Sequence, residues 1–253
     1  MDERGLPVPY AAVGLSGKSF GTLSDANGAF SLNLKWFSEK DTLKATGIGY
    51  ESKKVSLTEF IASGTYTIVL IATPGELAEV EILSKELKQE ELGCKRFHTN
   101  NCSGFVRNAS NWKGSEAGMF FQNKKNKQVF LESFSFYVIQ NKYEDSLSFR
   151  LMVYQPTDFG LPKYKSLLDR PVFFKIGKKN GEVIIDLKAY HIRVSGDFFI
   201  SIECLMDEMD ISKFCYAGSP ETPSFVKPAP FEKWSKVRGG GPDFKLRVLS
   251  SKD

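Results

Sequence analysis

The chain has 253 residues, of which 42% are hydrophobic and 13% aromatic, enough to fill two modest hydrophobic cores. Its 34 basic and 30 acidic residues are interspersed and give a formal net charge of +4, so the sequence lacks the long single-sign field that is typical of a dedicated nucleic-acid-binding protein. We therefore expect two domains and no nucleic-acid partner.

The sequence also argues against a membrane-spanning segment. No stretch approaches the roughly 18 consecutive apolar residues that a transmembrane helix needs. Residues 1–5 lack the apolar core of a signal peptide. Residues 5–10 have the pattern of a turn that enters a strand, and such a turn should follow an earlier strand. This indicates that a first strand and an export signal are missing from the sequence.

Residues 21–30 predict two strands joined by a tight turn. Asp25 can accept hydrogen bonds from its own backbone, Gly28 can adopt the positive φ that the turn needs, and Leu23 and Phe30 can enter a core on either side. Short strands at this spacing favour a β-sandwich. Further strands are expected at 10–15, 30–34, 41–50, 53–57 and 66–70.

Three ordered motifs support this assignment. They are GLPVPYAAV at 5–13, GTLSDANGAFSL at 21–32 and DTLKATGIGY at 41–50. Together they resemble the carboxypeptidase regulatory-like domain. The resemblance implies a seven-stranded, transthyretin-like sandwich without catalysis of its own, as found attached to zinc carboxypeptidases or in envelope proteins of Gram-negative bacteria. Family members usually begin with a further strand ahead of the first motif, which this chain lacks.

The domain boundaries follow from changes in composition. We expect the first domain at 1–83, with a last strand at 77–83, and a second domain at 95–253. The intervening residues 84–94 are the expected linker, and the charged stretch 84–92 is helix-prone.

Aromatic strands dominate the second domain, and no long helix is expected in it. These strands favour a jelly-roll-like sandwich, and their order is similar to a domain often found behind carboxypeptidase regulatory-like domains in exported bacterial proteins. The fold class is therefore all-β, with two sandwiches. The expected strands are 119–121, 129–139, 147–154, 171–176, 182–187, 191–194, 197–205, 213–217 and 244–249.

The four cysteines leave several pairings open. Cys94, His98 and Cys102 are spaced by four residues, but their loop-like surroundings argue against a zinc site, and we assign no metal. A Cys94–Cys102 disulfide is expected if the protein is exported, and free thiols if it is not. Cys204 and Cys215 could face each other across a hairpin, as a bridge or as buried thiols, and the apolar alternation around Cys204 favours packing over reactivity.

No catalytic motif is present. His98 and His191 are the only histidines, and neither belongs to a recognisable nucleophile or zinc-peptidase pattern, with His191 expected within a strand. We assign no catalytic residue and no cofactor. A hydrolase with carboxylates converging from separate strands stays open, without a preferred pair among Glu132, Asp158, Asp186 and Glu203.

Weak ligand-binding candidates come from aromatic residues and one arginine, because aromatic rings stack on sugar faces and arginine donates to hydroxyl or carboxylate groups. They are Trp112, Tyr154, Trp234 and Arg238. An interior or loop-anchoring role is the alternative for each of them.

Together these observations predict a non-enzymatic binding or assembly module of an exported cell-envelope protein, either periplasmic or associated with the outer membrane or secreted. Its partner would be an envelope protein or a glycan. The alternatives are a carbohydrate-binding protein that uses loops of the second sandwich, and the hydrolase.

Overall fold

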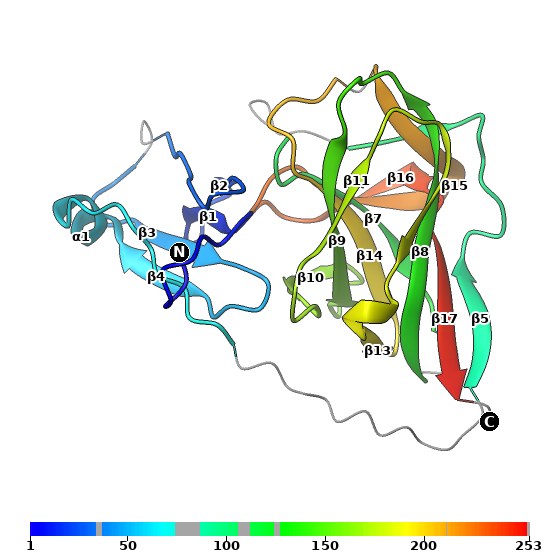
Figure 1. The fold of residues 1–253 in the computed structure, drawn as a ribbon, viewed down its shortest axis with the longest axis horizontal. Helices are drawn as coiled ribbons and strands as arrows, with labels where there is room; N and C mark the ends of the chain where they lie inside the picture. The colour runs from blue at the N-terminus through cyan, green and yellow to red at the C-terminus, as the bar shows by residue number, and fades with distance from the viewer. Residues whose placement is uncertain (34–36, 74–86, 106–111, 124–126, 211, 252–253) are drawn as a thin grey trace.

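The computed structural model describes residues 1–33, 37–73, 87–105, 112–123, 127–210 and 212–251. They form two domains that lie side by side, a small one at the N-terminus and a larger one that contains the C-terminus (Figure 1). The chain is all-β, as the sequence predicts, and the short α1 is the one α-helix in the described residues. No described helix is long and apolar enough to cross a membrane.

The first domain contains a four-stranded antiparallel sheet in the order β2-β1-β3-β4. Ser56 caps the N-terminus of α1, since its hydroxyl accepts a hydrogen bond from the Glu59 N–H. The elements are β1 (Ala12–Leu15), β2 (Gly21–Leu23), β3 (Thr42–Thr46), β4 (Lys53–Ser56) and α1 (Leu57–Ala62).

The turn at 21–30 forms as predicted. The Asp25 carboxylate accepts hydrogen bonds from the backbone N–H groups of Asn27 and Ala29, at 2.8 and 2.9 Å. Gly28 has φ +77°, where a side chain would be strained. Leu23 is buried, and Phe30 packs against a small core that includes Val8 and Val13.

Of the strands expected in this domain, two are not observed as named strands and a third cannot be compared. Residues 30–33 and 66–69 lie outside the named strands, although Phe30 and Leu32 still direct their side chains to the core. Period-two alternation therefore predicted that Phe30 and Leu32 face the core, but not whether a neighbouring strand pairs with the backbone. The strand expected at 77–83 lies outside the described residues.

The second domain is built from thirteen strands, and each of the nine expected ones is present in it. They are β5 (Leu87–Gly93), β6 (Cys102–Ser103), β7 (Glu116–Phe121), β8 (Gln128–Asn141), β9 (Leu147–Pro156), β10 (Pro162–Ser166), β11 (Val172–Ile176), β12 (Gly181–Asp186), β13 (Arg193–Ser195), β14 (Phe198–Cys204), β15 (Phe214–Lys227), β16 (Ser235–Pro242) and β17 (Lys245–Ser251), with the 3-10 helix η2 (Lys188–Tyr190) between β12 and β13.

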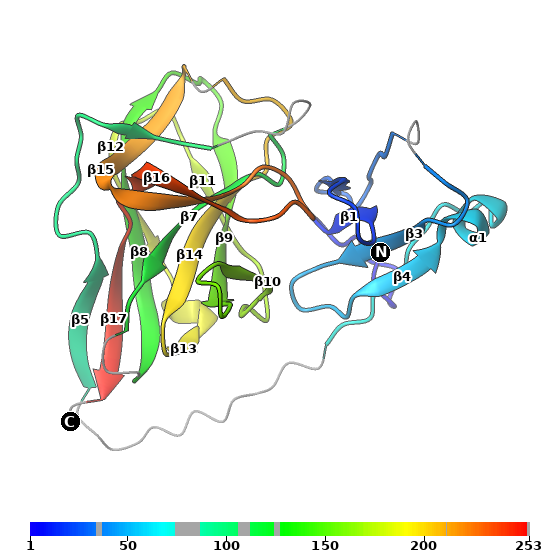
Figure 2. The ribbon, with the colours of Figure 1, turned by 180° about the vertical axis from the view of Figure 1, so that it is seen from behind.

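The long strand β15 joins two antiparallel layers. Its first part pairs with β6 and β8, in a layer with β17, β5, β12 and β13 that we call the outer sheet. Its second part pairs with β7 and β16, in a layer with β14, β9, β10 and β11 that we call the inner sheet. The inner sheet lies on the side of the first domain, and Figure 2 shows the same arrangement from behind.

The core between these layers is rich in stacked and edge-to-face aromatic rings. Phe149 stacks with Phe105 and Phe174, and Tyr216 packs edge-on against Phe136. Alternate residues of β14 enter this core, including the thiol of Cys204, which is fully buried. This burial agrees with the predicted packing role of Cys204, and it raises the pKa of the thiol to about 12.

Two local predictions for this half of the chain are wrong. Residues 87–93 of the expected linker and helix form β5, which pairs along its whole length with β17. Charged side chains are tolerated there because β5 is an edge strand with most of its residues exposed. His191 follows η2 with a left-handed φ of 52° and does not belong to a strand.

Candidate functional site

A row of four charged residues crosses the inner sheet. The register places Lys227 of β15 beside Glu116 of β7, Glu116 beside Glu203 of β14, and Glu203 beside Arg150 of β9. The sequence of charges across the four strands is therefore positive, negative, negative, positive. Residues directly opposite on neighbouring strands share one face of a sheet, so these side chains project together, away from the aromatic core.

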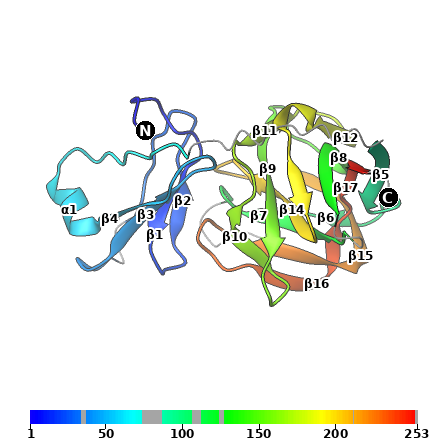
Figure 3. The same ribbon diagram turned by 90° about the horizontal axis from the view of Figure 1, so that it is seen from below.

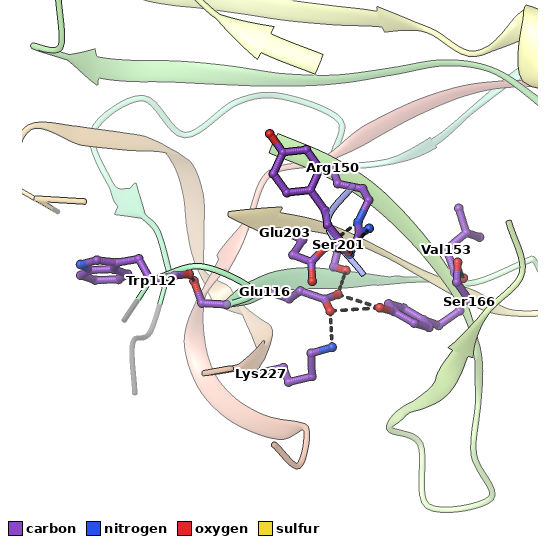
Figure 4. A network of polar contacts seen from close by, with 11 residues as sticks. Trp112, Glu116, Arg150, Val153, Ser166, Ser201, Glu203 and Lys227 are labelled. Carbon is purple, nitrogen blue, oxygen red and sulfur yellow. Dashed lines mark hydrogen bonds and ion pairs between the residues drawn. The ribbon is translucent and has the colours of Figure 1, made fainter. Parts of the chain in front are cut away.

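Each charge in the row is buried and has an opposite partner. Arg150 Nε donates to Glu203 Oε2 at 2.6 Å, and Arg150 Nη2 lies 2.5 Å from the same oxygen. Lys227 pairs with Glu116, which has no exposed surface. Figure 4 shows both pairs. Buried charges are costly unless they are paired and hydrogen-bonded, and this arrangement neutralises the row within itself.

Two hydroxyl groups complete the site. Ser201 of β14 donates to Glu116 Oε2 at 2.5 Å, and the Tyr154 hydroxyl donates to both oxygens of Glu116 at 3.0 Å. Burial, and Glu116 after it, raise the pKa of Tyr154 well above its ordinary value, so the hydroxyl keeps the proton that it donates. Burial also raises the pKa of Glu203, while Arg150 beside it opposes that rise.

The first domain covers one end of the row. Arg150 Nη1 donates to the backbone carbonyl of Tyr10 at 2.9 Å, and the guanidinium group lies 6.0 Å from the centre of the Phe173 ring. The Tyr10 ring packs against the same phenylalanine, with ring centres 5.2 Å apart. Ile48 of the first domain also packs against the Tyr154–Trp234 cluster. Arg150 therefore connects the carboxylates of one domain to the backbone of the other.

A second contact between the domains depends on two glycines. Gly14 and Gly21 face each other across β1 and β2. A Cβ atom at Gly21 would lie 2.5 Å from the Phe231 ring, and one at Gly14 would lie 2.6 Å from it. The ring of Phe231, from the loop between β15 and β16, therefore packs directly on the backbone at these two glycines. A side chain at either position would clash with the ring. Figure 3 shows the two domains side by side from below.

The four ligand-binding candidates do not form an exposed surface. Trp112 lies in the main core, and Tyr154 and Trp234 pack edge to face beside the charged row, with ring centres 5.6 Å apart. Lys227 lies over the Trp234 ring. Only Arg238, on β16, is exposed. A ligand-binding role for these residues stays a prediction, and the structure offers Arg238 alone to solvent.

The dispersed carboxylates do not converge either. Glu203 is buried in the charged row, Asp158 lies in the turn between β9 and β10, and Glu132 and Asp186 belong to the outer sheet. The described residues do contain a pocket of about 550 Å³, in the first domain, but no carboxylate lines it.

Both cysteine pairings considered from the sequence are wrong. The disulfide joins Cys102 to Cys215, and Cys94 and Cys204 are free. The pairing follows from tertiary structure, because β6 lies against β15 with Cys102 beside Ala217. With Cys102 in a disulfide, the Cys94, His98 and Cys102 set is not a zinc site, and no cluster of three or more metal-ligating side chains is found in the described residues.

Sequence reasoning missed Glu116, Ser201 and Lys227 and gave Arg150 no role. A usable signal was present, because Glu116, Arg150 and Glu203 are each the single charged residue of an otherwise uncharged strand. A charge at such a position needs a buried partner. The sequence does not say which strands bring the partners together.

Comparison with known proteins defines the first domain. Residues 1–82 match the family model of the CarboxypepD_reg-like domain. The first domain is a carboxypeptidase regulatory-like domain. The family match thus confirms the resemblance seen in the sequence motifs, and it supplies no catalytic residue for this chain.

Comparison of the whole chain gives little beyond this. No curated protein sequence matches it. Among solved structures, the chain is similar to the cysteine protease and lectin-like domains of Cwp84, a surface layer associated protein of Clostridium difficile, with 9% identity and a TM-score of 0.40. That match covers 55% of this chain and 32% of the other.

Proposed function

We propose that this protein is a non-enzymatic binding or assembly module of an exported cell-envelope protein, located in the periplasm or associated with the outer membrane or secreted. The carboxypeptidase regulatory-like domain supports a binding role. The observation that carries the proposal is the state of the charged row, in which every charge is buried and paired within the protein. Its carboxylates are held for structure and are closed to a substrate.

The row also suggests how the module works. Arg150 and Phe231 connect the carboxypeptidase regulatory-like domain to the second domain through buried or closely packed contacts. A partner would then meet two domains in one fixed orientation, and would not have to order them on binding. Such preorganisation lowers the entropic cost of association.

Two alternatives remain from the sequence. A carbohydrate-binding protein is the stronger one, because exposed aromatic side chains occur on the second domain, at residues other than those expected. A hydrolase receives no support from the geometry, since Glu116 and Glu203 are neighbours but inaccessible. The jelly-roll type of the second sandwich stays a prediction.

Cell fractionation and crosslinking test the proposal. The protein, followed by antibody in its own cells, is expected in the envelope or secreted fraction, and chemical crosslinking there should yield a discrete larger species. A cytosolic location would overturn export, and the absence of any crosslinked partner or bound glycan would overturn the binding role. Turnover of a glycoside or peptide panel that is abolished by Glu203→Gln would overturn the non-enzymatic assignment.

A further inference from the structure

The two most exposed large hydrophobic side chains in the described residues lie on one hairpin. Phe159, in the turn between β9 and β10, is 92% exposed, and Tyr164 on β10 is 65% exposed. The hairpin is at the edge of the inner sheet nearer the first domain (Figure 3). Single exposed hydrophobic residues are ordinary on a protein surface, but two aromatic rings five positions apart are a concentrated feature.

The turn that carries Phe159 is held firmly. The Thr157 N–H donates to the Leu161 carbonyl at 2.7 Å, and the Gly160 N–H donates to the Thr157 carbonyl at 2.9 Å. The Thr157 hydroxyl accepts from the Leu161 N–H at 3.2 Å, and Gly160 has the positive φ that closes the turn. Leu161 packs against the Tyr154–Trp234 cluster below. The Phe159 ring is therefore presented to solvent from an ordered support.

Two lysines precede and follow the second aromatic residue in the sequence. Lys163 and Lys165 flank Tyr164 on β10 and are exposed. Lys163 contacts Gln155, a neutral side chain, at 3.2 Å, and neither lysine has a carboxylate partner in the described structure. Asp158, next to Phe159, is the single acidic residue of the hairpin. The two lysines therefore give the hairpin a small net positive charge. The hairpin combines aromatic faces with a small excess of unpaired positive charge.

We propose that this hairpin, residues 157–165, binds an acidic polysaccharide. The proposal deepens the proposed binding function and rests on it. Aromatic rings stack on sugar faces, and lysine ammonium groups attract the carboxylate or sulfate groups of an acidic sugar chain. In the sequence Lys163 lies between the two rings and Lys165 follows the second, so the exposed surface of the hairpin is not the continuous apolar centre of a protein-protein interface. Charge complementarity therefore favours an anionic sugar polymer over a protein partner.

Calorimetry on the full chain tests this, with polygalacturonate and dextran sulfate as probes and uncharged dextran as the control polymer. The natural protein should bind a charged polymer and not dextran, and raising the salt concentration should weaken binding. Phe159→Ala, Tyr164→Ala and the double variant Lys163→Gln/Lys165→Gln should each lower the affinity by about fivefold to tenfold. Ile184→Ala, which removes a similarly exposed side chain (64%) from the outer sheet, should leave the affinity unchanged.

Other outcomes would overturn the proposal. Binding of neither charged polymer, or binding that the hairpin variants do not change, would exclude this site. Hairpin-dependent binding to anionic lipid vesicles without binding to the polymers would assign the hairpin to a membrane surface instead. If crosslinking finds an envelope partner while the hairpin variants do not change polymer binding, the proposed binding function is supported and the polysaccharide site on the hairpin is excluded. Because the substituted side chains are exposed, unchanged unfolding midpoints should show that the variants fold.

Discussion

Asp25 in the first domain and Glu116 in the second both have carboxylates that accept several hydrogen bonds, but they reach their donors differently. Asp25 binds backbone groups two and four residues away, at an exposed turn. Glu116 binds Tyr154, Ser201 and Lys227, from three other strands, with no exposed surface. A carboxylate can therefore stabilise a local turn or join strands that are distant in the sequence. The more deeply the carboxylate and its partners are buried, the more stability is lost when the contact is removed.

Removing the disulfide should have the largest effect on stability. Cys102 and Cys215 are 113 residues apart, and replacing both with serine should lower the free energy of unfolding by about 4–5 kcal/mol under oxidising conditions, because such a long loop restricts the unfolded chain. Denaturant unfolding measures the loss, and Cys94→Ser is the control with a small effect. Non-reducing peptide mapping should recover the 102–215 crosslink, and a 94–102 crosslink in its place would contradict this pairing.

The charged row should be nearly as sensitive. Arg150→Met leaves Glu203 buried without its cation and should cost about 3–5 kcal/mol in the free energy of unfolding. Arg247→Met is the matched control, since Arg247 is exposed and 4.0 Å from Glu91, and should cost less than about 1 kcal/mol. Adding Glu203→Gln to Arg150→Met should recover part of the loss. Equal effects of the two arginine variants would show that burial does not distinguish these pairs.

The contact between the domains should give a smaller change. Gly21→Ala places a Cβ atom 2.5 Å from the Phe231 ring and should cost about 1–3 kcal/mol through overpacking. Gly177→Ala, where the nearest atom lies 4.0 Å away, is the matched control and should be nearly neutral. In a double-mutant cycle, Phe231→Ala should remove part of the cost of Gly21→Ala. Strict additivity would mean that the clash lies elsewhere.

The turn should be the least sensitive of the four. Asp25→Ala removes two hydrogen bonds to the backbone at an exposed site and should lower the free energy of unfolding by about 1 kcal/mol. Asn27→Ala keeps the backbone N–H that donates to Asp25 and should stay within about 0.5 kcal/mol. Thermal or denaturant unfolding of both variants measures the difference. A loss at Asp25 as large as that at Arg150 would break the distinction between local and long-range polar contacts.

The sequence by itself determined the fold class, the presence of nine strands of the second domain, and the turn around Asp25 and Gly28. These features depend on the alternation of apolar and polar residues and on contacts between residues close in the sequence. Both can be recognised in the sequence without knowing the tertiary structure. The tertiary structure decided that 87–93 pair with β17, that Cys102 meets Cys215, and that Glu116 meets Lys227. Those partners are more than a hundred residues apart, and only the packing of strands selects them.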